Sequence, residues 1–402
     1  MNILRKAYCR TFQFCFRVAL PFLPYREPEI LNGMPEIARM LKEQELNRVL
    51  IVTDKGISSL GLLDGLKAAL KEQDIFYTVY DETVPNPTIA NVEAARKRYL
   101  DYHCQAIIGF GGGSSMDCAK AAGARIVKPR QSVNQMKGLL KVMKKLPPLI
   151  AVPTTAGTGS ETTLAAVVVD ERTHHKYPIN DFSLIPRYAV LDYHVTLGLP
   201  QSITATTGMD ALTHAVEAYI GRSTTRHTRA MAVEAVQLIH TYLKRAYDDG
   251  QDVEARTNML RAAYCAGIAF TQSYVGYVHG VAHSLGGEYG VPHGLANAVI
   301  LPYFLEEYGE SCAKRLGRLS RKCGIAGKKD SDILASQKFI DWVREMNDSM
   351  NIPRHIEGIR KADIPKMAKN AAKESNPLYP VPREMSAKEL EKMYYVAGNI
   401  RT

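Results

Sequence analysis

The chain has 402 residues, of which 46% are hydrophobic and 23% charged, and its net charge at pH 7 is +10. This length is too great for one compact core and predicts two or more domains, while the composition excludes a disordered chain. A basic balance can favour nucleic acid or anionic membranes. The sequence carries no helix-turn-helix, zinc-finger or aromatic RNA-binding motif, so we expect no nucleic-acid partner.

The cysteine pattern and the hydropathy indicate a cytoplasmic protein. There are seven cysteines, an odd number, and no two form a C-x-x-C pair. This argues against a disulfide framework or a thiolate zinc site and favours a reducing compartment. No run of eighteen apolar residues occurs, so we predict no transmembrane helix.

Residues 1–28 form a basic and apolar extension. Within it, Met1–Pro24 mixes four basic residues with phenylalanines and other apolar residues, a pattern typical of a basic amphipathic helix. Such a helix could lie on a membrane or a partner, or pack on its own protein or a neighbouring subunit. We favour packing over membrane contact. A signal peptide is disfavoured, because arginine interrupts the apolar stretch and no small-residue cleavage site follows.

Residues 29–199 alternate short β-branched apolar runs with helical patterns, which predicts a mostly parallel sheet covered on both faces. The expected strands are Arg48–Thr53, Phe76–Tyr80, Ala106–Phe110, Leu149–Val152, Leu164–Asp170 and Tyr188–Asp192, and the expected helices are Gly61–Gln73, Ile89–Tyr99 and Asp117–Val127.

Residues 200–402 lose the strand-like runs and keep helical spacing. Expected helices there are Gly208–Ile220, Thr228–Asp248, Val253–Phe270 and Gln337–Met350. The predicted fold class is therefore an α/β N-terminal domain, residues 29–199, followed by an all-α C-terminal domain, residues 200–402. In two-domain enzymes ligands usually bind in the cleft between the domains.

Two polar loops follow strands of the predicted sheet. Gly109–Asp117 contains a glycine run that opens a helix, and such a run lets backbone amides approach a diphosphate. Val152–Glu161 is rich in small hydroxyl residues that can donate to phosphate or ribose oxygens. Each loop alone also fits an ordinary tight or capped turn. Because both would lie on the same sheet edge, together they favour dinucleotide binding.

Asp54 ends the first of the strands listed above. Its carboxylate could hydrogen-bond the adenosine ribose and repel a 2′-phosphate, which would favour NAD over NADP. A helix N-cap is an equally good interpretation.

One aspartate and three histidines of the C-terminal half predict a metal site. Asp210 and His214 are four residues apart, as are His279 and His283, so each pair shares a helix face. His293 follows the stretch Leu285–Gly287, which we expect to be a glycine-rich turn. Asp210, His214, His279 and His293 would form a four-ligand site for a divalent iron or zinc. Each histidine alone also fits a buried or capping residue, and Glu217, one turn beyond His214, fits either a partner of a ligand or an ordinary ion pair.

These motifs resemble those of the iron-containing (group III) alcohol dehydrogenases. The resemblance runs from about Glu29 to the C-terminal helices, and residues 1–28 lie outside it. It is carried by Gly111–Asp117, Pro153–Glu161, Asp192–Glu217 and His279–Asn297.

The resemblance implies the dehydroquinate synthase-like fold, with a nicotinamide cofactor and a catalytic divalent metal. It assigns the four metal ligands named above and makes His283 a candidate for substrate contact or proton relay. The cofactor contacts that it implies are Asp54, Asn86, Gly112, Gly113, Ser114, Ser115, Thr154, Thr155, Ser160 and Lys176.

The predicted function is an NAD(P)-dependent alcohol dehydrogenase, in which Fe2+ or Zn2+ lowers the pKa of a small alcohol and hydride passes to the nicotinamide. NAD is favoured over NADP, and a homodimer is expected. Two alternatives stay open: a dehydroquinate synthase-like lyase that uses NAD transiently, and a non-catalytic nucleotide- and metal-binding assembly protein. The sequence does not identify the alcohol.

Overall fold

The computed structural model describes residues 3–173 and 175–401. It divides into two compact units. We call Pro24–Gly198 the sheet unit, and Met1–Leu23 together with Leu199–Thr402 the helical unit. The N-terminal extension is thus shared between them, because the chain up to Leu23 packs with the C-terminal helices.

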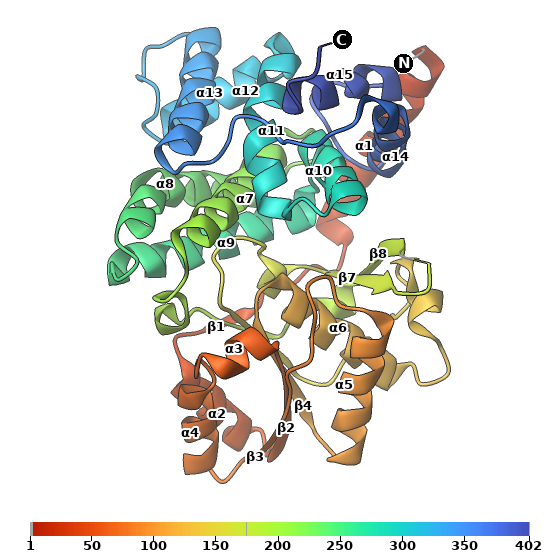
Figure 1. The fold of residues 1–402 in the computed structure, drawn as a ribbon, viewed down its shortest axis with the longest axis vertical. Coiled ribbons are helices and arrows are strands. Elements are labelled where there is room, and N and C mark those ends of the chain that lie inside the picture. Colours follow the sequence, from red (N-terminus) through yellow and green to blue (C-terminus); the bar gives the residue numbers. More distant parts are fainter. Residues whose placement is uncertain (1–2, 174, 402) are drawn as a thin grey trace. The chain divides into compact units, whose positions relative to one another are not determined.

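The sheet unit is built on a six-stranded sheet in which every pair of neighbours is parallel (Figure 1). Parallel pairing requires a crossover between successive strands, which the intervening helices provide. In spatial order the strands are β1 (Glu29–Leu31), β9 (Tyr188–Val190), β6 (Leu149–Pro153), β4 (Ala106–Gly111), β2 (Arg48–Val52) and β3 (Phe76–Tyr80).

Both faces of this sheet are buried, as expected for a parallel sheet. In β2, Leu50 and Val52 belong to one apolar core, and Val49 and Ile51 belong to the core on the other face. The α-helices of the sheet unit are α2 (Met34–Glu43), α3 (Lys55–Ser59), α4 (Asp64–Glu72), α5 (Ile89–Asp101) and α6 (Gly113–Val127).

The six predicted strands and three predicted helices of this unit are confirmed, with two differences. The helix predicted from Asp117 begins at Gly113, so the last glycine of the run and Ser114–Met116 form its first turn. The predicted strand Leu164–Asp170 is β7 (Ala165–Asp170), but it lies outside the parallel sheet. It pairs antiparallel with β8 (His175–Asn180) in a small sheet completed by β5 (Gly138–Leu139). A hairpin of this kind needs only a short turn and no crossover helix.

The described part of the helical unit consists of α-helices and short 3-10 turns, as predicted (Figure 1). The four helices that the sequence predicted there correspond to α7, α8, α9 and α13. The α-helices are α1 (Ile3–Ala19), α7 (Gln201–Ile220), α8 (Arg226–Asp248), α9 (Val253–Ser273), α10 (Tyr277–Tyr289), α11 (His293–Tyr308), α12 (Glu310–Lys322), α13 (Asp332–Ser349), α14 (Ile364–Ser375) and α15 (Ala387–Ala397).

Helix α7 lies at the centre of this unit. Every residue from Gly208 to Ile220 is buried, which identifies a core helix rather than an amphipathic surface helix. Polar residues on its buried part therefore need partners inside the protein, and Asp210, His214 and Glu217 are such residues.

None of the described helices combines the length and the apolar character that crossing a bilayer requires.

Candidate active site

The helical unit brings together the four side chains that the sequence pattern singled out. Each of them offers one ligand atom, and these four atoms all lie within 4.8 Å of one another. Asp210 and His214 project from α7, His279 from α10, and His293 is the first residue of α11. Asp210, His214 and His279 are buried, whereas His293 is partly exposed. The cluster is therefore accessible from the side of His293.

The approach of α11 to α7 depends on a residue without a side chain. A Cβ atom at Gly294 would lie 2.5 Å from the backbone oxygen of Thr206 in α7 and 3.5 Å from Cβ of Asp210. Any larger residue would push the start of α11 away from α7. Gly294 thus allows α11 to approach α7 closely enough for His293 to lie beside Asp210.

The expected turn at Leu285–Gly287 is wrong, because these residues continue α10 as far as Tyr289. A glycine inside a helix costs only about 1 kcal/mol relative to alanine, so tertiary packing can keep Gly286 and Gly287 in the helix. The segment that precedes His293 is Gly290–Pro292 instead, and Gly290 ends α10 in a left-handed backbone conformation.

Glu217 orients His279. Its carboxylate accepts hydrogen bonds from the backbone amides of Gly276 and Val278, at 2.8 and 2.9 Å, and lies 2.6 Å from Nδ1 of His279. With Nδ1 donating to this carboxylate, Nε2 of His279 carries its lone pair toward the other ligands. Burial, followed by the neighbouring histidines His214 and His293, lowers the pKa of His279 well below its ordinary value. A neutral imidazole is the form that binds a metal.

His214 is held by aromatic packing. Its ring stacks on Phe270 of α9 at a centroid distance of 4.1 Å and an interplanar angle of 13°, and it also stacks on His279 at 4.5 Å. Flat contacts on the two rings restrict rotation of the imidazole. His214 thus keeps one orientation in the cluster.

Asn297 contacts three of the four ligands. Its Nδ2 donates to Oδ1 of Asp210 at 2.7 Å and lies 3.2 and 3.1 Å from Nε2 of His279 and His293. One donor can approach three acceptor atoms only where their lone pairs converge. A set of one carboxylate and three imidazoles whose lone pairs converge suits a divalent transition metal.

A series of hydrogen-bonded side chains begins beside the cluster. The ring of His283 stacks on His293 at 5.1 Å, and Nδ1 of His283 lies 2.6 Å from Oε1 of Glu374 in α14. The hydroxyl of Tyr379 donates to the same oxygen at 2.7 Å. Burial raises the pKa of Glu374, but the charge of His283 and the hydrogen bonds outweigh burial and lower it. Glu374 is therefore an ionised carboxylate that accepts a hydrogen bond from His283 and would stabilise a positive charge on its imidazole.

In the sheet unit, the two predicted loops lie side by side. The amide of Thr154 donates to the backbone oxygen of Gly111 at 3.0 Å. A Cβ atom at Gly113 would lie 3.3 Å from Cγ2 of Thr158, so the second loop passes close to the first turn of α6. The first-turn amides of a helix have no partner inside the helix and attract anions. The start of α6 therefore provides backbone donors for a phosphate.

Several predicted cofactor hydroxyls already have protein partners. Ser115 Oγ donates to Oδ2 of Asp54 at 3.3 Å, and Ser160 Oγ donates to Oδ1 of Asp117 at 2.9 Å. Both serines are buried. These two side chains position the loops, which leaves the backbone amides as the groups that a ligand would meet first.

Lys120 connects α6 to the second polar loop, Val152–Glu161, and to the residues that follow it. It is fully buried, and five oxygen atoms lie 2.6 to 3.1 Å from its Nζ, which can donate to three of them at a time. They are Oγ and the backbone oxygen of Ser160, Oγ1 and the backbone oxygen of Thr163, and the backbone oxygen of Ala165. Burial lowers the pKa of Lys120 to about 8 and raises that of the nearby buried Glu161 to about 7. An ammonium with five oxygen partners can stay charged in the interior.

Three further predicted residues meet at the start of α6. Nζ of Lys176 donates to Oδ1 of Asn86 at 2.6 Å, and the amide of Asn86 donates to Oγ of Ser114 at 3.1 Å. Asp54 caps α3, because its Oδ1 accepts from the amide of Ile57 at 3.0 Å. The N-cap interpretation of Asp54 is confirmed.

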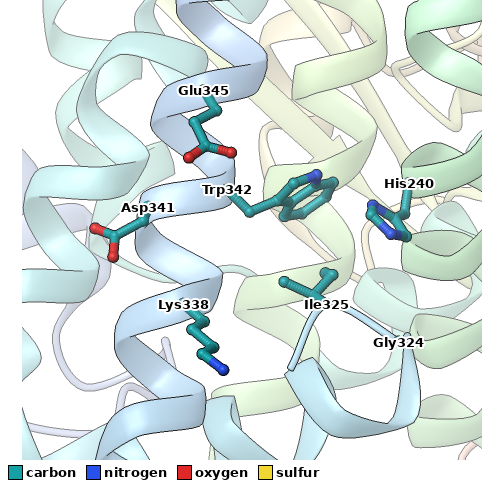
Figure 2. A pocket seen from close by; sticks show the side chains of 7 residues that line it. All are labelled: His240, Gly324, Ile325, Lys338, Asp341, Trp342 and Glu345. Atoms are coloured by element: carbon teal, nitrogen blue, oxygen red, sulfur yellow. The ribbon is translucent and has the colours of Figure 1, made fainter. Parts of the chain in front are cut away.

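A pocket of about 330 Å3 lies in the helical unit and shares no residue with the ligand cluster. Figure 2 shows Trp342 and His240 facing each other there, with Lys338, Asp341 and Glu345 on the same helix as Trp342. Its lining mixes both signs of charge with an aromatic pair and gathers none of the sequence-predicted site residues. We assign it no role in catalysis.

Sequence reasoning missed three residues of these sites. Asn297 stands four residues after His293 and shares its helix face, so spacing could have revealed it. Glu374 is separated from His283 by 91 residues, and no sequence pattern connects them. Lys120 follows the glycine run, but lysine is almost never fully buried, and burial is what defines its role.

Comparisons with known proteins agree with this geometry. The family model for iron-containing alcohol dehydrogenase matches residues 30–193, and the model for the C-terminal part of that family matches residues 204–398. Alcohol dehydrogenase 4 of Schizosaccharomyces pombe is 38% identical over 360 residues, covering 88% of this chain and 84% of the relative. The NAD-dependent methanol dehydrogenase of Bacillus methanolicus is 34% identical over 342 residues, covering 85% and 90%. The crystal structure of a 1,3-propanediol oxidoreductase superposes with a TM-score of 0.88 at 32% identity, covering 93% of this chain and 99% of the other.

Proposed function

This chain belongs to the iron-containing alcohol dehydrogenase family, and on that premise we propose which of its residues carry the reaction. It is a metal-dependent alcohol dehydrogenase that interconverts an alcohol with its aldehyde or ketone. We assign the metal to Asp210, His214, His279 and His293. The observation that carries this assignment is the convergence of their four ligand atoms within 4.8 Å.

The chain prepares these ligands before any ion arrives. Asp210 supplies the negative charge that partly offsets a divalent cation, and Asn297 holds its carboxylate. Glu217 fixes the tautomer of His279. The bound cation would supply Lewis acidity at the alcohol oxygen, and the nicotinamide ring would accept the hydride. The donor set accepts Fe2+ or Zn2+, and we propose one of these as the native ion.

We propose that NAD binds to the sheet unit at the two polar loops. The diphosphate would meet the amides of Gly112, Gly113, Ser114 and Ser115, and the nicotinamide end would lie at Thr154, Thr155 and Ser160. Asn86 and Lys176 contact each other, and the backbone amide of Asn86 donates to Ser114; the two side chains would add an amide and a cation near the phosphates. The carboxylate of Asp54 would disfavour the 2′-phosphate of NADP. The NAD dependence printed for the methanol dehydrogenase relative supports this choice.

His283 is proposed as the proton relay. Its ring stacks on His293 at the accessible side of the cluster, and its Nδ1 contacts Glu374. A proton released near His293 could therefore pass to His283, whose charged imidazole Glu374 would stabilise, and Tyr379 holds the carboxylate in place. A His283→Ala enzyme with unchanged kcat across pH would remove this role.

The proposal is tested by removing and restoring the metal. The purified enzyme is treated with a chelator, and then separate portions receive Fe2+ or Zn2+. Each portion is assayed with NAD and with NADP on short primary alcohols, diols and hydroxy acids. We expect net NADH formation only after a metal is restored, and a higher kcat/KM with NAD than with NADP.

Two results would contradict it. Full activity after removal of every divalent ion would refute the metal assignment. No net NADH with any of these alcohols would instead favour the lyase alternative, in which the cofactor is oxidised and reduced within one cycle. We expect the active species to be a homodimer, which light scattering measures directly.

A further inference from the structure

Helix α1 presents two very different faces. A helix turns by about 100° per residue, so Cys9, Gln13 and Leu20 lie on one side when the helical turn is continued to Leu20. These three residues are buried, and Phe16, on the same side, packs edge-on against Tyr274 at a centroid distance of 5.0 Å. This inner face fixes the orientation of α1 on the helical unit.

Polar contacts hold the inner face in place. Nε2 of Gln13 donates to the backbone oxygens of Tyr379 and Pro377, at 2.9 and 3.3 Å. The guanidinium of Arg10 donates to the backbone oxygens of Val381 and Pro382 at 2.8 and 2.9 Å, and it forms an ion pair with Glu384. Because buried polar groups need these partners, α1 cannot rotate its other face inward.

The opposite face is apolar and points away from the protein. Its exposed apolar members span about 140° of the helix and bear no charge. We call the following residues the outer face: Ile3, Leu4, Tyr8, Phe14 and Val18, with exposed fractions of 85, 82, 61, 65 and 54%. The other residues in this sector are Ala7, Thr11 and Cys15. Phe22, just beyond the helix, is 84% exposed. A surface helix normally turns its apolar side inward, so this arrangement is inverted.

Basic side chains border the outer face. Arg5 lies on one border, and Lys6 and Arg17 lie on the other; all three are exposed. Residues 1–26 contain no aspartate or glutamate. An uncharged apolar stripe with cations on both borders matches a helix that lies in the headgroup region of an anionic bilayer.

We propose that α1 docks this enzyme on an anionic lipid surface. The outer face enters the boundary between headgroups and acyl chains, and Lys6 and Arg17 contact lipid phosphates. The catalytic reaction is unchanged by this contact, which places the enzyme at the membrane and therefore near apolar alcohols and aldehydes that partition into it.

A second copy of the chain fits this face less well. A 17-residue helix is about 25 Å long and about 10 Å wide, so its outer face offers far less than the roughly 800 Å2 per partner that a stable dimer buries. Two copies of α1 packed on each other would also bring Lys6 and Arg17 of one copy close to those of the other, because α1 itself contains no acidic residue. A lipid surface supplies the negative charge that α1 lacks.

The test is sedimentation of the full-length metal-loaded enzyme with vesicles. Two vesicle types are used: pure phosphatidylcholine, and an equimolar mixture of phosphatidylcholine and phosphatidylglycerol. We expect binding to the mixed vesicles, weaker binding to pure phosphatidylcholine, and release when salt is raised. The double variants Phe14→Ser/Val18→Ser and Lys6→Glu/Arg17→Glu should each lower the partition coefficient by at least about tenfold.

Matched variants elsewhere in the helical unit serve as controls. Ile333→Ser removes an apolar side chain that is 66% exposed on α13. Lys328→Glu/Lys329→Glu makes the same charge change on the loop after α12, where both lysines are exposed. Both controls should bind vesicles like the unmodified enzyme. All variants should keep the dehydrogenase activity in solution, which shows that they are folded.

Three results would overturn the proposal: no binding of the unmodified enzyme to either vesicle type, an equal loss of binding in the controls, or a lower molecular mass by light scattering for Phe14→Ser/Val18→Ser with vesicle binding unchanged. The last result would identify the outer face as a contact between copies of the chain. None of these results bears on the metal or NAD assignments, because their assays contain no lipid.

Discussion

The ligand cluster of the helical unit and the polar loops of the sheet unit organise their polar groups in opposite ways. In the cluster, a ligand side chain is held through an atom that does not face the other ligands. Glu217 contacts Nδ1 of His279, for example, and leaves Nε2 facing them. In the loops, the side chains themselves are engaged, since Ser115 and Ser160 donate to Asp54 and Asp117. The ligand cluster therefore offers side-chain lone pairs to a ligand, whereas the polar loops offer backbone amides.

Removing the charged ligand should have the largest effect. Asp210→Asn keeps the size of the side chain but removes its charge, so the site should lose its divalent ion. We expect kcat/KM to fall at least about 1000-fold, equivalent to about 4 kcal/mol of transition-state stabilisation, with metal content measured by elemental analysis.

The control is His240→Gln, which changes a histidine of the same unit that lies outside the cluster. It should keep both metal and activity. If Asp210→Asn retained the metal and the rate, Asp210 would not be a metal ligand, and the assignment of the metal to these four side chains would be wrong.

Lys120→Met should mainly affect the sheet unit. The substitution removes a buried ammonium from its oxygen partners and takes away a positive charge that favours the ionised forms of Asp117 and Glu161. Breaking a buried charge pair from one side costs about 3 to 5 kcal/mol. We expect a lower midpoint for urea unfolding of the sheet unit and weaker NAD binding, while the metal content stays the same.

Lys128→Met is the matched control on the residue after α6, where the side chain is partly exposed. It should change the unfolding free energy by no more than about 0.5 kcal/mol. Loss of metal from Lys120→Met would show that the two sites are energetically coupled and would break the contrast between them.

Glu161 gives the sheet unit a dependence on pH. Burial raises its pKa from 4.5 to about 7, so the folded state holds this proton longer than the unfolded state does. The stabilisation is complete below pH 4.5 and is lost as the pH rises through 7, by roughly 3 kcal/mol. Glu161→Gln should flatten the curve of unfolding free energy against pH in this window. An unchanged curve would mean that Lys120 keeps Glu161 ionised throughout.

The same contrast explains what the sequence could predict. Two residues of the proposed metal site, Asp210 and His214, could be predicted as neighbours because i, i+4 spacing places them on one face of one helix. The two polar loops, Gly109–Asp117 and Val152–Glu161, could be predicted because glycine and hydroxyl residues follow predicted strands there. The positions of Glu374 and Lys120 depend on contacts between distant segments and on burial, and neither leaves a periodic signal. β7 was predicted as a strand, but its own residues do not show that its partner is the antiparallel strand β8 rather than a strand of the parallel sheet.

Glu217→Gln should have the smallest effect on the enzyme, because it leaves all four proposed ligands in place. It therefore tests most directly whether the ligand cluster depends on a contact to an atom that faces away from the metal. The amide can still accept from Gly276 or Val278, but it is a weaker acceptor for Nδ1 of His279 than a carboxylate. Changing such a partner of a metal ligand typically lowers metal affinity 10- to 100-fold, or about 1.4 to 2.7 kcal/mol. Competition with a chelator measures the Kd for Zn2+, and Glu234→Gln, which removes an ion pair with Arg261 outside the cluster, is the control. An unchanged Kd would mean that Phe270 and the backbone alone orient the imidazoles.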